Sequence, residues 1–390
     1  MTKKSESGKI IFGYVFVVVF VLAIGIRESK GTIITSGTDG SRIALGVQSF
    51  GQLNAAPASG EVHVLNSSGC EVGIALEWTQ AQLDVVGSGS SPGFYDAISP
   101  GNRYEGWGVS GFNDGDAGAG SGYVNSYTGF SGGVPVNLTN DSFTSTVSSV
   151  TSVTSITTGP ALQVTQTYAA SIAAPNRLFE NKVVIKNTGA TAIGNVRYVR
   201  VMDWDVPQTE FTEFSTIQGT VTTTMLDGAN SSHDGGYSLS DPFAVYDGGD
   251  DSTDGNFGFK QFANDNSTLD TDYIDNGGGA AADTGVYFRF NFGSLAADAE
   301  YGFSIFYGAA GTEFDMLVGL QLAGAELYSL GNSNVTNHEL SPTYAFAFTG
   351  VGGEEIVNVV PEPGTFALLG IGLAGLGYLS RKRIFKFKTR

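Results

Sequence analysis

Apolar and β-branched residues occur in many short runs along residues 31–359, separated by Gly, Asp, Asn and Ser. This pattern is typical of strands with one buried face. It predicts strands near residues 42–47, 61–65, 71–77, 161–168, 183–189, 196–206, 236–246, 285–292, 300–307 and 343–350. Short strands at regular spacing, with turn residues between them, predict a mainly β fold in which antiparallel strands form a sandwich-like ectodomain.

One segment, Glu313 to Leu330, has the spacing of an amphipathic helix. Apolar residues recur at three- and four-residue intervals from Met316 to Leu327, and Gly331 follows as a stop signal. We therefore expect a single helix near residues 313–330 in an otherwise β-rich region.

The N-terminal 30 residues have the pattern of an export signal. Lys3, Lys4 and Lys9 precede an uninterrupted apolar stretch of 17 residues, Ile10 to Ile26. A basic start followed by an apolar helix is the mark of a signal peptide that signal peptidase removes. An uncleaved N-terminal anchor is the alternative, and either one places the following residues outside the cytoplasm.

The C-terminal region, residues 360–390, has three parts in order. Pro361, Glu362 and Pro363 interrupt the chain, and an uncharged apolar run follows at 366–379. A basic tail then begins with the membrane-stop cluster Arg381, Lys382 and Arg383. The run predicts a short transmembrane helix in contact with membrane lipid, and the positive-inside rule places the tail in the cytoplasm.

These three parts together resemble the PEP-CTERM sorting signal, whose region is also called the ice-binding protein C-terminal type. The resemblance implies a substrate of exosortase, a membrane enzyme of bacteria that make extracellular polysaccharide. It assigns recognition to Pro361, Glu362 and Pro363, and it covers about 25 of the 390 residues. A plain tail anchor is the alternative.

Composition excludes one class of function. The chain has a net charge of −18, and residues 31–359 hold 9 basic and 35 acidic residues. A nucleic-acid partner is not expected, because binding to phosphates requires a basic surface.

A Thr- and Ser-rich stretch lies at residues 139–158, where 13 of 20 residues are Ser or Thr. It could form a regular hydroxyl face that binds ice or polysaccharide, or it could be an ordinary half-exposed strand or a connector. If the stretch is a connector, the ectodomain divides into two parts near residues 140–160.

An acidic stretch from Asp203 to Asp283 holds 16 acidic residues and one basic residue. Within it Asp250, Asp254 and Asn256 follow the opening register of a calcium loop. Position twelve of that register is Gln261 rather than the bidentate Glu that such a loop requires. A solvated acidic turn is the alternative to a calcium site, and no other cofactor is expected.

Trp204, between Asp203 and Asp205, is a candidate ligand site. The indole could form a platform for a sugar, with the carboxylates binding its hydroxyl groups, or it could be half-buried packing. Two carboxylates on one side of a strand do not straddle a bond as a glycosidase pair must.

No catalytic residue is expected. The three histidines, His63, His233 and His338, stand in no recognisable catalytic or metal-binding motif. The sequence therefore predicts an exported cell-envelope or extracellular-matrix protein that is not an enzyme. We expect it to be membrane-anchored or released to the surface, with exosortase, signal peptidase, membrane lipid and exopolysaccharide as partners. A carbohydrate-binding or carbohydrate-active surface protein is the alternative, followed by ice binding.

Overall fold

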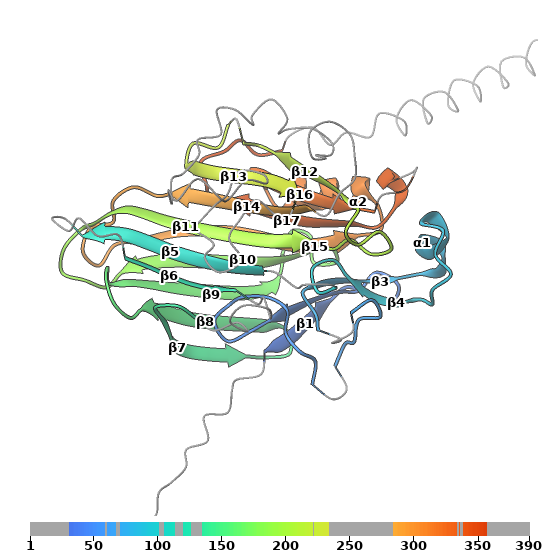
Figure 1. Ribbon diagram of the computed structural model, residues 1–390, viewed down its shortest axis with the longest axis horizontal. Coiled ribbons are helices and arrows are strands. Elements are labelled where there is room, and N and C mark those ends of the chain that lie inside the picture. The colour runs from blue at the N-terminus through green and yellow to red at the C-terminus, as the bar shows by residue number, and fades with distance from the viewer. Residues whose placement is uncertain are drawn as a thin grey trace, which may run out of the picture.

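The computed structural model confirms that the protein is mainly β and antiparallel (Figure 1). It describes residues 31–58, 61–67, 71–100, 105–113, 120–125, 135–220, 222–233, 284–333, 335 and 338–356. The strands that it describes form three sheets of four, eight and five strands.

The four-stranded sheet comes from the first part of the described chain. Its strands pair in sequence order as β1 (Thr32–Ser36), β2 (Ile43–Val47), β3 (Ile74–Trp78) and β4 (Gly93–Asp96). Helix α1 (Gln80–Val85) follows β3. All five residues of β2 are buried, because apolar side chains cover both faces of this sheet. Such a strand reads as a continuous apolar run rather than an alternating one.

The eight-stranded sheet is assembled from both halves of the chain. Its order is β12 (Phe214–Gln218), β16 (Leu327–Asn332), β17 (Thr343–Thr349), β15 (Glu300–Ala310), β10 (Leu178–Asn187), β9 (Leu162–Ala170), β8 (Ser149–Ile156) and β7 (Leu138–Ser145). In β9, buried and half-buried residues alternate from Leu162 to Tyr168. One face of this part of the sheet therefore points into the core and the other points away from it.

The five-stranded sheet has the order β13 (Leu226–His233), β14 (Thr284–Asn291), β11 (Ile193–Trp204), β5 (Glu105–Asn113) and β6 (Gly120–Asn125). Its aromatic side chains meet those of the eight-stranded sheet. The rings of Phe288 and Phe348 are 5.1 Å apart, and those of Tyr198 and Phe303 are also 5.1 Å apart. The four-stranded sheet joins the same core, where Trp78 donates a hydrogen bond to the Tyr344 hydroxyl.

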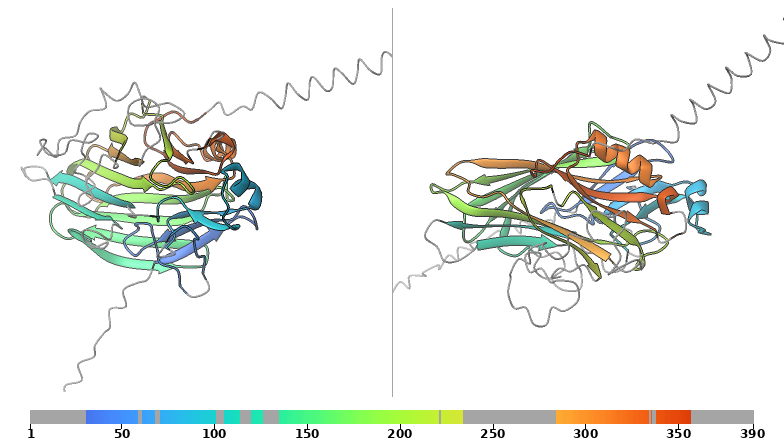
Figure 2. Two further views of the ribbon diagram at one scale, coloured as in Figure 1. Left: turned by 45° about the vertical axis from the view of Figure 1, so that its right-hand side comes forward. Right: turned by 90° about the horizontal axis from the view of Figure 1, so that it is seen from above.

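Helix α2 (Glu313–Leu322) lies against β15 and β17, as the right-hand view of Figure 2 shows. The predicted helix over 313–330 is correct at its start and wrong at its end. The chain leaves the helix at Gly324, whose φ of +67° favours glycine, and Leu327 begins strand β16. The apolar residues from Leu327 to Leu330 fit a strand buried on both sides as well as they fit a helix.

Most of the predicted strands within the described residues are present, but two strands that are consecutive in sequence do not pair with each other. The segments 183–189 and 196–206 follow one another in sequence, yet β10 pairs with β9 and β15, whereas β11 pairs with β5 and β14. The chain passes from one sheet to the other between them. Residues 61–65 form only an isolated bridge at Val64, and residues 236–246 lie outside the described part.

Residues 138–156 form the hairpin of β7 and β8 at one end of the eight-stranded sheet. The sheet continues from this hairpin into β9 and β10, so strand pairing is continuous across residues 140–160.

Among the residues that the structure describes, no helix is both long and apolar enough to cross a membrane. The apolar segments predicted at residues 10–26 and 366–379 lie outside those residues.

Candidate sorting signal and candidate ligand-binding residues

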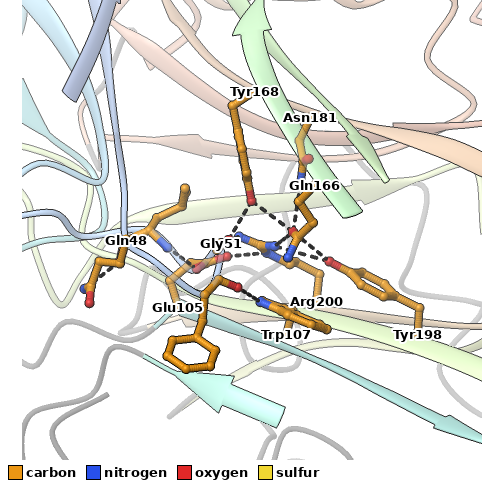
Figure 3. Close-up of polar contacts among 11 residues, drawn as sticks. Gln48, Gly51, Glu105, Trp107, Gln166, Tyr168, Asn181, Tyr198 and Arg200 are labelled. Carbon is orange, nitrogen blue, oxygen red and sulfur yellow. Dashed lines mark hydrogen bonds and ion pairs between the residues drawn. The ribbon is translucent and has the colours of Figure 1, made fainter. Parts of the chain in front are cut away.

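A cluster of polar side chains lies between the eight- and five-stranded sheets (Figure 3). We call it the core polar cluster, and its members are Glu105, Gln166, Tyr168, Tyr198 and Arg200. Each of these side chains belongs to a fully buried residue. They come from β5, β9 and β11, which are far apart in sequence.

Arg200 is the centre of the core polar cluster. Its Nε lies 2.5 Å from Glu105 Oε1, and its Nη1 donates to Gln166 Oε1 at 2.7 Å. The guanidinium also lies over the ring of Tyr307, 5.4 Å from the centroid. A buried charge needs such partners, since leaving one unpaired in the interior costs several kcal/mol.

The cluster also holds a loop that follows β2. Arg200 Nη2 and the Tyr168 hydroxyl both donate to the carbonyl of Gly51, at 2.9 and 2.5 Å, and the Leu53 amide donates to Glu105. A Cβ on Gly51 would lie 2.4 Å from Gln166 Nε2, and the φ of Gly51 is +80°. The backbone conformation therefore favours glycine here, and a Cβ would also displace the Gln166 amide.

Burial determines the protonation chemistry of the cluster. It raises the pKa of Glu105, while the Arg200 charge and the Leu53 amide act in the opposite direction. Burial also raises the pKa of Tyr198 to about 12, against the effect of Arg200. The cluster is enclosed, and its hydrogen bonds to Gly51 and Leu53 hold the loop that follows β2 in place.

Sequence reasoning missed this cluster. A signal was present, because Arg200 has the same strand parity as Tyr198, Met202 and Trp204, which are buried. An arginine in an apolar row of a strand requires a carboxylate partner, but the sequence does not say which of the acidic residues supplies it.

Trp204 is fully buried at the end of β11. Its indole nitrogen donates to Ser329 Oγ at 3.0 Å, and a Cβ on Gly331 would lie 2.9 Å from its ring. Asp205 is also buried, and Asp203 is half-buried. The enclosed indole offers no face to a sugar, so the packing alternative describes Trp204 in this structure.

The predicted calcium residues Asp250, Asp254 and Asn256 lie outside the described residues. Within the described part of the chain, no group of three or more His, Cys, Asp or Glu side chains is arranged to hold a metal ion. The calcium site stays a prediction.

The last described segment, residues 350–356, is fastened to the domain by Glu326. The carboxylate of Glu326 accepts hydrogen bonds from the amides of Gly350, Val351 and Gly353, at 2.8–2.9 Å. The Ile356 amide donates to Ala325 at 3.0 Å. Four residues separate Ile356 from Pro361, so the five Cα–Cα steps between them span at most about 18 Å.

The comparison with protein families bears on this C-terminal region. The model of the PEP-CTERM protein-sorting motif matches residues 359–383. The match includes Pro361, Glu362, Pro363 and the basic cluster Arg381, Lys382 and Arg383. The chain thus carries a PEP-CTERM sorting motif at residues 359–383, as the sequence analysis predicted, and the motif indicates an exported protein sorted by an exosortase. No similar protein was found among curated proteins.

Proposed function

We propose that this protein is delivered to the cell envelope, where exosortase processes it near Pro361, Glu362 and Pro363 and leaves a sandwich-like ectodomain outside the cytoplasm. The motif match at residues 359–383 is the observation that carries this proposal. The role of the ectodomain is interaction with the cell surface or matrix rather than catalysis. Two features of the described residues support that role.

The first feature is the enclosed core. The core polar cluster lies away from solvent, and Trp204 is used for packing. The second feature is the position of the strap at residues 350–356. Hydrogen bonds to Glu326 hold this strap to the domain, and the strap precedes the sorting motif by a few residues in the sequence.

The arrangement in the envelope follows from the two ends. The N-terminal segment acts as a signal for signal peptidase or as an anchor, and residues 366–379 cross the membrane with Arg381, Lys382 and Arg383 on the cytoplasmic side. Exosortase is the processing partner. After processing the ectodomain is held at the surface or released to the matrix.

The test replaces Pro361, Glu362 and Pro363 together with alanine in the full chain, in a host that has the exosortase. Mass spectrometry of the intact protein should then show residues 366–390 still attached, whereas the unchanged protein loses them. Glu354→Gln is the matched control, because it alters a nearby carboxylate outside the motif. Equal processing of the alanine variant and of the control would contradict the proposal.

Calcium binding by Asp250, Asp254 and Asn256 is a separate part of the proposal, supported by the loop register alone. Millimolar calcium should raise the melting temperature, and a chelator should reverse the rise. Asp254→Asn should abolish the response, and no change with calcium in the original protein would remove the site.

A further inference from the structure

One row of side chains crosses six neighbouring strands of the eight-stranded sheet. The pairing of β7, β8, β9, β10, β15 and β17 places five hydroxyl residues and one lysine in line, in the order Thr144, Thr151, Thr167, Lys182, Ser304 and Thr349. We call this the hydroxyl row. Five steps between strands make it about 24 Å long.

The hydroxyl row lies on the face of the sheet that points away from the core. Its residues alternate along their strands with buried ones, such as Ser152, Gln166 and Tyr168, which face the loop after β2. Thr144 is exposed, and 62% of the Lys182 side chain is exposed. Helix α2 covers the same face farther along, over β15 and β17, as Figures 1 and 2 show.

The row ends in a surface depression of about 380 Å³. Its lining includes Lys182, Val184, Gly302, Ser304 and Thr349. A Cβ on Gly302 would find its nearest neighbours at 3.8 and 4.0 Å, so packing does not require glycine there. The missing side chain instead leaves the depression open beside the Lys182 ammonium group.

This face holds lysines together with the carboxylates of Asp141, Glu180 and Glu300. All five arginines among the described residues lie within ion-pair distance of carboxylates. Lys182 and Lys186 are the two lysines of the described part, and both lie on this face of β10. Lys182 Nζ lies 3.9 Å from Glu180 Oε2, the longest ion pair of this group, and Lys186 is opposite Glu300 on β15. The two lysines of the described residues thus lie on one sheet face, and Lys182 is the more exposed of them.

We propose that the hydroxyl row binds an extended, carboxylated polysaccharide, with a carboxylate of the polymer at Lys182 in the depression beside Gly302. This inference rests on the proposed location outside the cytoplasm. The backbone groups of β8, β9, β10 and β15 are already paired on both sides, so a ligand on this face is recognised by side chains rather than by strand addition.

Hydroxyl side chains suit such a polymer because each one both donates and accepts hydrogen bonds. The hydroxyl oxygens of Thr151 and Thr167 lie 3.4 Å apart on the paired strands β8 and β9. The Ser304 hydroxyl donates a hydrogen bond to Glu180, and its oxygen can still accept one from a ligand. A straight line of these groups matches a repeating chain of hydroxyls, and Lys182 supplies the charge that selects a uronic acid over a neutral sugar.

The experiment uses the purified full chain and measures binding of three polymers by calorimetry: polygalacturonate, neutral dextran and poly-glutamate. Polygalacturonate should bind, more weakly as salt rises, and the other two should bind at least tenfold less tightly. Lys182→Gln should weaken polygalacturonate binding about tenfold or more, because it removes a charge-assisted contact. Gly302→Val should do the same by filling the depression.

Two matched variants control for charge and for side-chain bulk. Lys186→Gln removes the other lysine of the same face, and Gly89→Val adds the same bulk at an exposed glycine with no atom within 4 Å of its Cβ position. Both should bind within about twofold of the original protein, and all four variants should keep its melting temperature, as surface substitutions do.

Several results would overturn the proposal. They are no binding of polygalacturonate, equal binding of dextran, equal losses in Lys182→Gln and Lys186→Gln, or unchanged binding in Gly302→Val. Tighter binding of poly-glutamate would also overturn it, in favour of an acidic polypeptide. Processing at the sorting motif is measured separately by mass, so failure of one proposal is distinguishable from failure of the other.

Discussion

Strands β9 and β10 present opposite chemistry on their two faces, although both faces are rich in polar residues. On the inner face Gln166, Tyr168 and Asn181 are buried and joined by hydrogen bonds to one another and to Arg200. On the outer face Thr165, Thr167 and their neighbours lie at the surface.

The comparison shows that burial determines whether a polar side chain serves stability or binding. A buried polar group must find its partner within the protein, so its removal leaves others unsatisfied. A surface hydroxyl is satisfied by water and can exchange that water for a ligand. The inner face therefore determines stability, and the outer face is available for binding.

The largest expected effect comes from breaking the buried ion pair. Glu105→Gln leaves the Arg200 charge without its carboxylate and should lower the free energy of unfolding by about 3–5 kcal/mol. Urea denaturation measures this loss. The matched control is Glu300→Gln on the exposed end of β15, which should change stability by no more than about 0.5 kcal/mol. Similar losses in both variants would show that burial is not the cause.

A second buried carboxylate, Asp96, should make stability depend on pH. Burial raises the pKa of Asp96 to about 6, against three backbone amides, Gly73, Ile98 and Ser99, that donate to it. Since the folded pKa is above the unfolded value of 3.8, the folded state binds the proton more tightly. The resulting stabilisation is complete below about pH 4 and is lost as the pH rises through 6.

Comparison with Asp96→Asn isolates this contribution. The stability of the original protein minus that of the variant should fall by about 2–3 kcal/mol between pH 3.5 and pH 7, the free energy that corresponds to the raised pKa. Urea denaturation across this range measures it. A difference that stays constant with pH, or that rises, would contradict the raised pKa.

The smallest effects compare two adjacent residues on opposite faces of β9. Tyr168→Phe removes one of the two donors to the Gly51 carbonyl and should cost about 1–1.5 kcal/mol. Thr167→Val removes a surface hydroxyl and should stay within about 0.5 kcal/mol. Thermal or urea unfolding of the two variants measures the contrast, and a larger loss in Thr167→Val would reverse the assignment of the faces.

Local patterns predicted the strands well but not their partners. The alternation in 161–168 and the apolar runs near 285–292 and 343–350 correspond to β9, β14 and β17. The same evidence could not show that β10 and β11 lie in different sheets, because strand pairing depends on contacts between distant segments. The sequence also could not show that the helix ends at Leu322, because the apolar residues beyond it fit a helix and a strand equally well.

The candidate sites divide in the same way. Pro361, Glu362 and Pro363 could be found from the sequence, because a sorting motif is read as a short linear segment. The core polar cluster could not, because its members come from three strands. Of the hydroxyl row, the sequence indicated only Thr144 and Thr151, in the Thr- and Ser-rich stretch 139–158, because the other members come from four further strands. Trp204 looked like a ligand platform beside two acids, and only the packing of Gly331 and Ser329 against it shows that it is enclosed.

The sequence by itself determined that this protein is mainly β and that it carries a sorting motif at its C-terminus. Both are local properties, set by side-chain alternation along a strand and by the order of a few residues. Only the tertiary structure decided that Arg200 meets Glu105 in the core and that Lys182 stands in a line of hydroxyls on the outer face. The physical reason is that burial and strand register arise from the whole chain, which selects among pairings that each segment alone would allow.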